Sequence, residues 1–209
     1  MSSCSLLLIR HGQTDWNAHN IVQGHTDIDL NPHGILQAKK LALMLEKRHG
    51  DLHKIYSSDL NRALSTARES ASLFNLPIQT SSSLREIFLG PAEGLTFEER
   101  ANRYGEIEKM LNQQFPTFKQ RWQHTSIAES ETVHALWERL NSALTEIAHQ
   151  NRGKKIAIFS HGRAIKTLIE ASTQEKFTSL FDNCSIAHFI YDFAIEENPL
   201  QFVKIEELS

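Results

Sequence analysis

The sequence predicts a three-layer α/β/α sandwich with a mainly parallel central sheet, and two observations carry this prediction. Short apolar runs typical of buried strands alternate with longer stretches of helical spacing, and strands that alternate with helices build parallel sheets. Two of these runs, at residues 6–9 and 155–159, end alike, because His11-Gly12 follows the first and His161-Gly162 the second. If the two strands are neighbours in one parallel sheet, both imidazoles lie at its carboxyl edge.

The first half of the chain predicts two helices and two further strands. Asn31-Pro32 is typical of a helix start, with asparagine as the N-cap and proline in the first turn, and the helix stops near Gly50. A second strand is expected over residues 53–57. Asp59 is then expected to cap a helix that runs to about residue 74, and a short strand follows at Pro77.

The middle of the chain predicts helix in pieces. Residues 97–122 have helical character that we expect to be broken near Gly105 and Pro116. Residues 131–148 predict a long amphipathic helix, since apolar residues from Val133 onward recur on one face.

The last third predicts a helix through Leu168 and then two strands, over residues 186–195 and 200–205. Asn198-Pro199 between these strands indicates an antiparallel hairpin. We expect a single domain over residues 1–209, in which residues 90–130 form a cap insertion.

The composition limits the partners and the compartment. A chain of 209 residues, 40% of them hydrophobic, is long enough to bury a sizeable core, and its formal net charge of −3 gives no basic footprint for nucleic acid. Cys4 and Cys184 are the only cysteines and are expected to be free thiols. No apolar run approaches the roughly 20 residues that span a bilayer, and residues 6–9 are too short for a signal peptide. We expect a cytoplasmic protein with no nucleic-acid or membrane partner.

Five motifs, taken in order, resemble the histidine phosphatase superfamily, in the branch that holds cofactor-dependent phosphoglycerate mutases and related small-molecule phosphatases. The resemblance runs from about residue 6 to about residue 193. It implies a phosphoglycerate mutase-like fold and an enzyme that acts on a small phosphorylated metabolite. The motifs are Arg10-His11-Gly12 followed by Asn17, Gln23-Gly24, the stretch 57–63 with Arg62, Leu84-Arg85-Glu86, and Ser160-His161-Gly162.

His11 is the expected nucleophile. An imidazole attacks phosphorus when it is neutral, and its ordinary pKa of about 6.5 makes that the main form at neutral pH. Water can then hydrolyse the phospho-imidazole. A core histidine bonded to backbone is the alternative, but the position between Arg10 and Gly12 at a strand end favours a site.

Arg10 and Arg62 are the expected phosphate clamp, because a guanidinium meets two phosphoryl oxygens at once and keeps its charge beside another cation. Two surface arginines in ion pairs are the alternative. Asn17 would either bind the same phosphate or anchor the loop. The family resemblance places His161, followed by Gly162, in the phosphate pocket, with His161 as an imidazolium that stabilises the transferring oxygens.

Glu86 matches the family's general acid. A leaving alkoxide needs a proton, which an arginine cannot supply at neutral pH. Glu93 is the rival for this role, and we interpret it as structural. Gln23-Gly24 and Glu131 resemble parts of the substrate side or the pocket rim, with loop and helix-cap roles as the alternatives.

No metal and no cofactor is expected at this site, since arginines and histidines already supply the positive charge. The chain has no Gly-x-x-x-x-Gly-Lys phosphate loop and no dinucleotide fingerprint. The remaining histidines show no metal-ligand spacing and are interpreted as surface or core residues: His19, His25, His33, His49, His53, His124, His134, His149 and His188.

The favoured function is hydrolysis of a phosphomonoester. Mutases of this family carry a longer middle segment and a longer C-terminal tail, and this chain is short in both places. Phosphoglycerate mutase-type phosphoryl transfer is the alternative. A non-catalytic phospho-ligand binding module is a third reading, against which the full set of catalytic residue types argues. An exposed edge beside the C-terminal hairpin would allow a homodimer.

Overall fold

A computed structural model describes residues 3–179 and 181–208. Its sheet has the strand order β3-β2-β4-β1-β5-β6. The first four strands in this order are parallel, and β5 and β6 form an antiparallel edge. The predicted mainly parallel sheet and the closing hairpin are therefore confirmed. The strands are β1 (Ser3–Arg10), β2 (Leu52–Ser57), β3 (Ile78–Thr80), β4 (Lys155–Ser160), β5 (Ile186–Asp192) and β6 (Leu200–Glu206).

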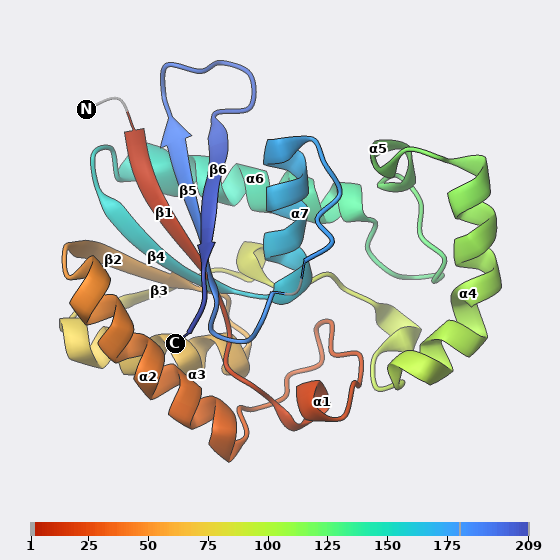
Figure 1. Ribbon diagram of the computed structural model, residues 1–209, viewed down its shortest axis with the longest axis horizontal. Helices are drawn as coiled ribbons and strands as arrows, with labels where there is room; N and C mark the ends of the chain where they lie inside the picture. The colour runs from red at the N-terminus through yellow and green to blue at the C-terminus, as the bar shows by residue number, and fades with distance from the viewer. Residues whose placement is uncertain (1–2, 180, 209) are drawn as a thin grey trace.

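Helices cover both faces of the sheet, which confirms the three-layer prediction. α2 (Pro32–His49) and α3 (Asn61–Phe74) cover one face, and α6 (Val133–Gln150) and α7 (Gly162–Thr173) cover the other, while α4 stands apart at the right of the view (Figure 1). Within the described ranges, no helix combines the length and hydropathy that crossing a membrane requires. The shorter or outlying elements are α1 (Asp15–Ala18), α4 (Phe97–Gln114), α5 (Phe118–Arg121) and two 3-10 turns, η1 (Ser82–Leu84) and η2 (Gly90–Ala92).

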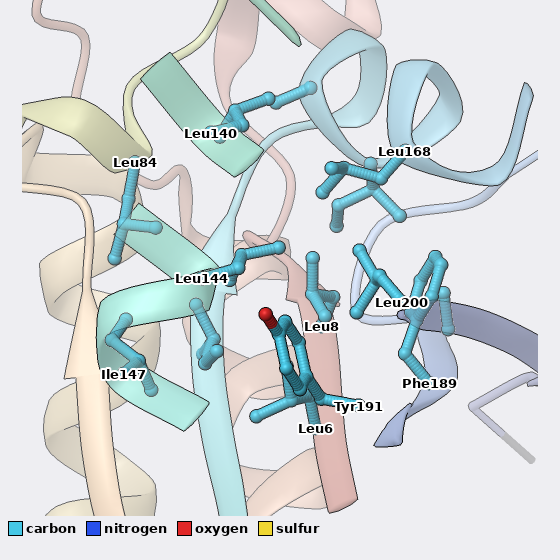
Figure 2. Packing of buried hydrophobic residues seen from close by; sticks show 14 of the residues in the cluster. Leu6, Leu8, Leu84, Leu140, Leu144, Ile147, Leu168, Phe189, Tyr191 and Leu200 are labelled. Atoms are coloured by element: carbon cyan, nitrogen blue, oxygen red, sulfur yellow. The ribbon is translucent and has the colours of Figure 1, made fainter. Parts of the chain in front are cut away.

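β1 is buried on both sides, as a central strand of a parallel sheet must be. Leu6 and Leu8 pack into the cluster formed with α6 and α7, and Leu7 and Ile9 pack into the cluster formed with α2 and α3. In Figure 2, Leu144 of α6 reaches toward Leu8. Each such side chain contributes about 1.5–3 kcal/mol through burial, so the strand that ends at the site is firmly held.

The predicted ends of α2 are confirmed. Asn31 caps the helix by accepting a hydrogen bond from the Gly34 amide (2.8 Å), Pro32 follows in the first turn, and Gly50 is the C-cap. The predicted Asp59 cap of α3 is wrong: Leu60 occupies the N-cap. The Asp59 carboxylate binds the Arg85 guanidinium instead, at 2.7 and 2.6 Å.

The predicted break at Gly105 is also wrong, whereas the break at Pro116 is confirmed. α4 runs unbroken from Phe97 to Gln114. A capping box between Thr96 and Glu99 stabilises its start. A glycine inside a helix costs about 1 kcal/mol, which an 18-residue capped helix tolerates.

Candidate active site

The two His-Gly strands are neighbours, as predicted. In the β1–β4 register Arg10 pairs with Ser160, and the His11 amide donates to the Ser160 carbonyl at 3.1 Å. The rings of His11 and His161 therefore lie side by side, with centroids 5.2 Å apart and planes tilted by 60°. Both side chains are buried.

The His11 ring is held in one tautomer. Its Nδ1 lies 2.7 Å from the Gly12 carbonyl, which can only accept, so Nδ1 carries the proton and Nε2 keeps its lone pair in the neutral ring. Burial first, and then the charges of Arg62 and Arg10, lower the pKa of His11 well below its ordinary value. Asn183 donates to the His11 carbonyl at 2.9 Å and so fixes the backbone. His11 is thus a neutral imidazole with a free Nε2 lone pair.

His161 is enclosed more completely. Its Nε2 lies 2.9 Å from the Ser58 hydroxyl, and its buried Nδ1 has no hydrogen-bond partner within residues 3–179 and 181–208. Burial and the nearby Arg62 charge lower the pKa of His161 well below its ordinary value. The protein's own groups therefore keep this ring neutral, and the imidazolium expected from the sequence would require the negative charge of a bound phosphate.

Two buried guanidinium groups stand beside the histidines. Arg62 donates to the carbonyls of Thr26 (2.9 Å) and Gly24 (2.7 Å), and burial lowers its pKa to about 10, so it stays charged at neutral pH. Arg10 donates to the Phe181 carbonyl. In both side chains Nε is buried and has no hydrogen-bond partner among the described residues. A buried unsatisfied donor costs about 1–3 kcal/mol, so these two N–H groups suit an anion.

The loop that holds Arg62 is itself held by Glu93. Gly24 adopts φ +54°, and a Cβ there would lie 2.1 Å from Glu93 Oε1, so this position requires glycine. Glu93 accepts hydrogen bonds from the amides of His25 (2.9 Å), Thr26 (2.8 Å) and Leu89 (3.0 Å). These contacts fit the structural interpretation of Glu93.

Glu86 lies in the loop between η1 and η2, and its carboxylate reaches the N-terminal end of α7. Its Oε1 accepts from the amides of Ile87 (2.9 Å) and Ala164 (3.0 Å), and its Oε2 accepts from the Arg163 amide (3.0 Å). The carboxylate thus meets the N-terminal end of a helix dipole, where negative charge is stabilised. Among the described residues, Oε2 accepts from the Arg163 amide alone, so it keeps a lone pair free.

A family model described as the histidine phosphatase superfamily (branch 1) matches residues 6–195. The chain belongs to this superfamily. Members of the superfamily act through a phosphohistidine intermediate, so this histidine phosphatase is an enzyme of phosphoryl chemistry.

Curated relatives and solved structures agree with this family. Phosphoglycerate mutase-like protein 4 of Arabidopsis thaliana is 34% identical over 167 residues, which cover 79% of this chain and 69% of the relative. The metal-independent phosphoserine phosphatase of the same plant is 30% identical over 182 residues, covering 87% and 74%. A phosphoserine phosphatase from Entamoeba histolytica, solved in complex with phosphoserine, superposes with a TM-score of 0.78 at 30% identity and covers 98% of each chain.

One pocket of this histidine phosphatase, about 860 Å³ in volume, gathers nearly all the site residues predicted from the sequence. Asn17 serves in part as a loop anchor, because its Oδ1 accepts from the Thr14 amide (3.2 Å). His161 stands beside His11 rather than in the pocket lining. The predicted residues that line the pocket are Arg10, His11, Asn17, Gln23, Gly24, Arg62, Glu86 and Gly162.

Arg139, which the sequence reasoning missed, holds the backbone that carries Glu86. Its Nη1 donates to the carbonyls of Ser83 (3.0 Å) and Arg85 (2.8 Å), and its Nη2 donates to the Glu86 carbonyl (2.7 Å). Glu131 completes the set by accepting from Nε (2.7 Å) and Nη2 (2.9 Å) of the same guanidinium. The eight-residue spacing from Glu131 to Arg139, about two helical turns, is the one signal in the sequence that links the pair.

The cationic wall of the pocket also escaped the sequence reasoning. Arg163, Lys166 and Lys176 line it together with Arg10, and Arg163 pairs with Glu170 at 3.3 Å. Burial first, and then the charges of Arg10 and Arg163, lower the pKa of Lys166. An anion bound beside Lys166 would offset the repulsion between these positive charges. From the cap side, Phe97 is the aromatic residue among the described pocket lining.

Proposed function

We propose that this histidine phosphatase hydrolyses small phosphomonoesters through a phosphohistidine on His11. The observation that carries the proposal is the His11 Nε2 lone pair, fixed by the Nδ1–Gly12 bond in a pocket that Arg10 and Arg62 also line. Nε2 attacks phosphorus while the unpaired N–H groups of the two arginines bind phosphoryl oxygens. The dianion raises the basicity of His161, which then offers a positive charge to the transferring group.

Glu86 is proposed as the general acid. As the bond from Nε2 of His11 to phosphorus forms, the bond from phosphorus to the leaving oxygen breaks, and Glu86 Oε2 gives its proton to that oxygen. The resulting carboxylate takes a proton from water, the water oxygen attacks phosphorus, and the bond to Nε2 breaks. Inorganic phosphate leaves, and both Glu86 and His11 return to their starting states.

Release of inorganic phosphate tests hydrolysis against the mutase alternative. Purified enzyme is supplied with p-nitrophenyl phosphate and with 3-phosphoglycerate, whose free hydroxyl can accept a phosphoryl group, each with and without 2,3-bisphosphoglycerate, and the products are followed by ³¹P NMR. We expect stoichiometric phosphate from both. If the phosphoryl group instead moves to another hydroxyl of the metabolite, and does so only when bisphosphoglycerate is present, the enzyme is a mutase.

The substrate class is proposed to carry a second anionic group. Lys166 of α7 lines the pocket beside the clamp arginine Arg10 and adds positive charge to the groups that bind the phosphate, whereas its neighbour Arg163 already pairs with Glu170 at 3.3 Å. A carboxylate close to the phosphate would meet this charge. Relatives named for phosphoserine, which has such a carboxylate, support the proposal.

Phosphoserine and phosphoethanolamine form a matched pair for this proposal, because they differ by the carboxylate alone. We expect kcat/KM to be at least about 10-fold higher for phosphoserine, and the Lys166→Gln change to remove most of that preference through KM. Lys54→Gln, away from the pocket, is the control. An unchanged preference in Lys166→Gln would remove this lysine from substrate recognition.

Chelation is expected to leave catalysis intact. Because imidazoles and guanidiniums supply the charge in the pocket, kcat/KM should be the same before and after dialysis against excess EDTA. The measurement is p-nitrophenyl phosphate turnover at both stages. Loss of turnover with EDTA, restored by one divalent ion, would contradict the proposed mechanism.

Arg139→Lys is expected to displace Glu86 while leaving the other residues of the site in place. Lysine keeps the charge but loses the planar fork that binds the backbone carbonyls. Turnover of an alkyl phosphate should fall about 10-fold more than turnover of p-nitrophenyl phosphate, since only the first needs a proton on the leaving group. Arg68→Lys, an exposed arginine of α3, is the control. Equal losses on the two substrates would indicate general destabilisation instead.

We also propose one domain over residues 1–209 with residues 90–130 as a cap. A small separate core of Ala92, Tyr104 and Ile127 supports this division. The free thiols of Cys4 and Cys184 support the prediction of a cytoplasmic enzyme. The homodimer stays a prediction, and sedimentation of the purified chain would test it.

A further inference from the structure

A second cluster of ionisable side chains lies on the α2 face of the sheet. His49 ends α2, His188 lies in the middle of β5, and Glu206 ends β6. His188 pairs with Leu7 of β1, four positions before His11, and none of the three cluster residues lines the catalytic pocket. One ligand atom from each of the three lies within 4.8 Å of the other two.

Both imidazoles converge on one carboxylate oxygen. The His49 Nε2 lies 3.1 Å and the His188 Nε2 3.0 Å from Glu206 Oε2. Tetrahedral zinc, with bonds of about 2.0–2.1 Å, holds its ligand atoms about 3.3 Å apart. Each nitrogen therefore needs to move only a few tenths of an ångström away from Oε2, and the two nitrogens lie within 4.8 Å of each other. We propose that His49, His188 and Glu206 bind one transition-metal ion, Zn²⁺ being the best fit.

The chemistry of the donors suits zinc rather than magnesium or calcium. Two imidazole nitrogens and one carboxylate oxygen are ligands that zinc prefers, whereas the harder ions take oxygen alone. Burial lowers the pKa of His188, so its lone pair is available at neutral pH. Although burial alone acts the other way, hydrogen bonds from Arg48 and His49 hold the pKa of Glu206 at about 2.

Arg48 prepares the carboxylate for this role. Its guanidinium binds Glu206 Oε1 at 2.6 Å, which orients the group and directs Oε2 at the imidazoles. The side chains of His49, His188 and Glu206 are 10%, 13% and 11% exposed, so the cluster is nearly dry but a solvent ligand can complete the tetrahedron. In the metal-bound form the proton of each neutral imidazole would move from Nε2 to Nδ1, and the two Nε2 lone pairs would bind the ion in place of the N–H groups that now point at Oε2.

The bound ion would fasten three elements together. α2 and the β5–β6 hairpin meet at this cluster, so one metal would join the C-terminal edge strand to the helix that packs under β1. Its role would be structural and independent of the phosphoryl chemistry, so it is compatible with catalysis that survives chelation.

Zinc binding to the full, tag-free chain tests the proposal. Equilibrium dialysis against Zn²⁺, with metal analysis, is done on wild type, His49→Gln, His188→Gln, His11→Gln and the control His134→Gln, whose partly exposed imidazole pairs with Glu138 at 3.4 Å. We expect one ion per chain in wild type and the control, and at least about 10-fold weaker binding in the two cluster variants. Zinc at about 100 times its Kd should raise Tm by about 5–10 °C in wild type and the control alone.

Several results would overturn the proposal. These are no zinc bound to wild type, equal binding in both cluster variants, or binding lost only in His11→Gln, which would place the ion at the catalytic pair. Circular dichroism in EDTA checks that the variants fold. If they do not, Co²⁺ is added to wild type, where a tetrahedral visible band and paramagnetic shifts of the His49 and His188 ring protons are expected. Shifts confined to His11 and His161 would contradict the assignment.

Discussion

Replacing His11 by alanine is expected to lower kcat for phosphomonoester hydrolysis by at least about 10³-fold, because the covalent route is lost. The ring bonds the Gly12 carbonyl, lies beside His161 and belongs to neither large hydrophobic cluster, so the variant should still fold. His33→Ala, an exposed position, is the control. The measurement is steady-state release of p-nitrophenol, with thermal melts of all three proteins.

Trapping the intermediate makes this expectation specific. Wild type quenched during turnover of ³²P-labelled substrate should carry phosphate that is labile to acid and stable to base, on the peptide that contains His11. Because the pKa of His11 lies well below its ordinary value, protonation of the nucleophile should limit kcat/KM only below about pH 6.5. Label found on His161 or on a carboxylate would refute the assignment.

Glu86→Gln is expected to slow hydrolysis of an alkyl phosphate by about 10²–10⁴-fold while p-nitrophenyl phosphate falls much less. Glutamine keeps an oxygen that can accept from the α7 amides but has no acidic proton to give. An alkoxide needs that proton, whereas p-nitrophenolate leaves without it. The measurement is kcat/KM for both substrates.

Glu93→Gln is the matched control for this experiment. Glu93 accepts from His25, Thr26 and Leu89 and so supports the loop that holds Arg62. Its loss should therefore lower Tm and affect both substrates alike. If Glu93→Gln shows the leaving-group dependence and Glu86→Gln does not, the two roles are reversed. Equal losses in Glu86→Gln would point to phosphate positioning.

The proximity of His11 and His161 was predictable because each histidine follows a strand pattern that can be seen in a few neighbouring residues. Each pattern consists of an apolar run, an imidazole and a glycine. Because strands in an alternating α/β chain are usually parallel, the two imidazoles are expected at the same edge of the sheet. The helix start at Asn31-Pro32 is local in the same sense. Asp59 shows the limit of such local signals. Its carboxylate could cap a helix, but it binds the guanidinium of Arg85, 26 residues away, instead.

The supporting contacts of the site were not predictable, because their partners are backbone groups. Arg139 binds three carbonyls and Glu86 three amides, and any sequence presents such groups. Glu86 and Arg163 are 77 residues apart, and only the completed sheet brings them together. The side chains that we expect to react can thus be listed from the sequence, whereas the contacts that orient them depend on the fold.

The distance between the rings of His11 and His161 is set by the spacing of adjacent strands, about 4.7–4.9 Å, and not by any loop. Insertions and substitutions in the cap therefore leave this distance unchanged during evolution. Related proteins can therefore differ in the cap residues that contact the rest of the substrate and still keep the same arrangement of the two rings. Relatives at about 30% identity that carry different substrate names are what such inheritance produces.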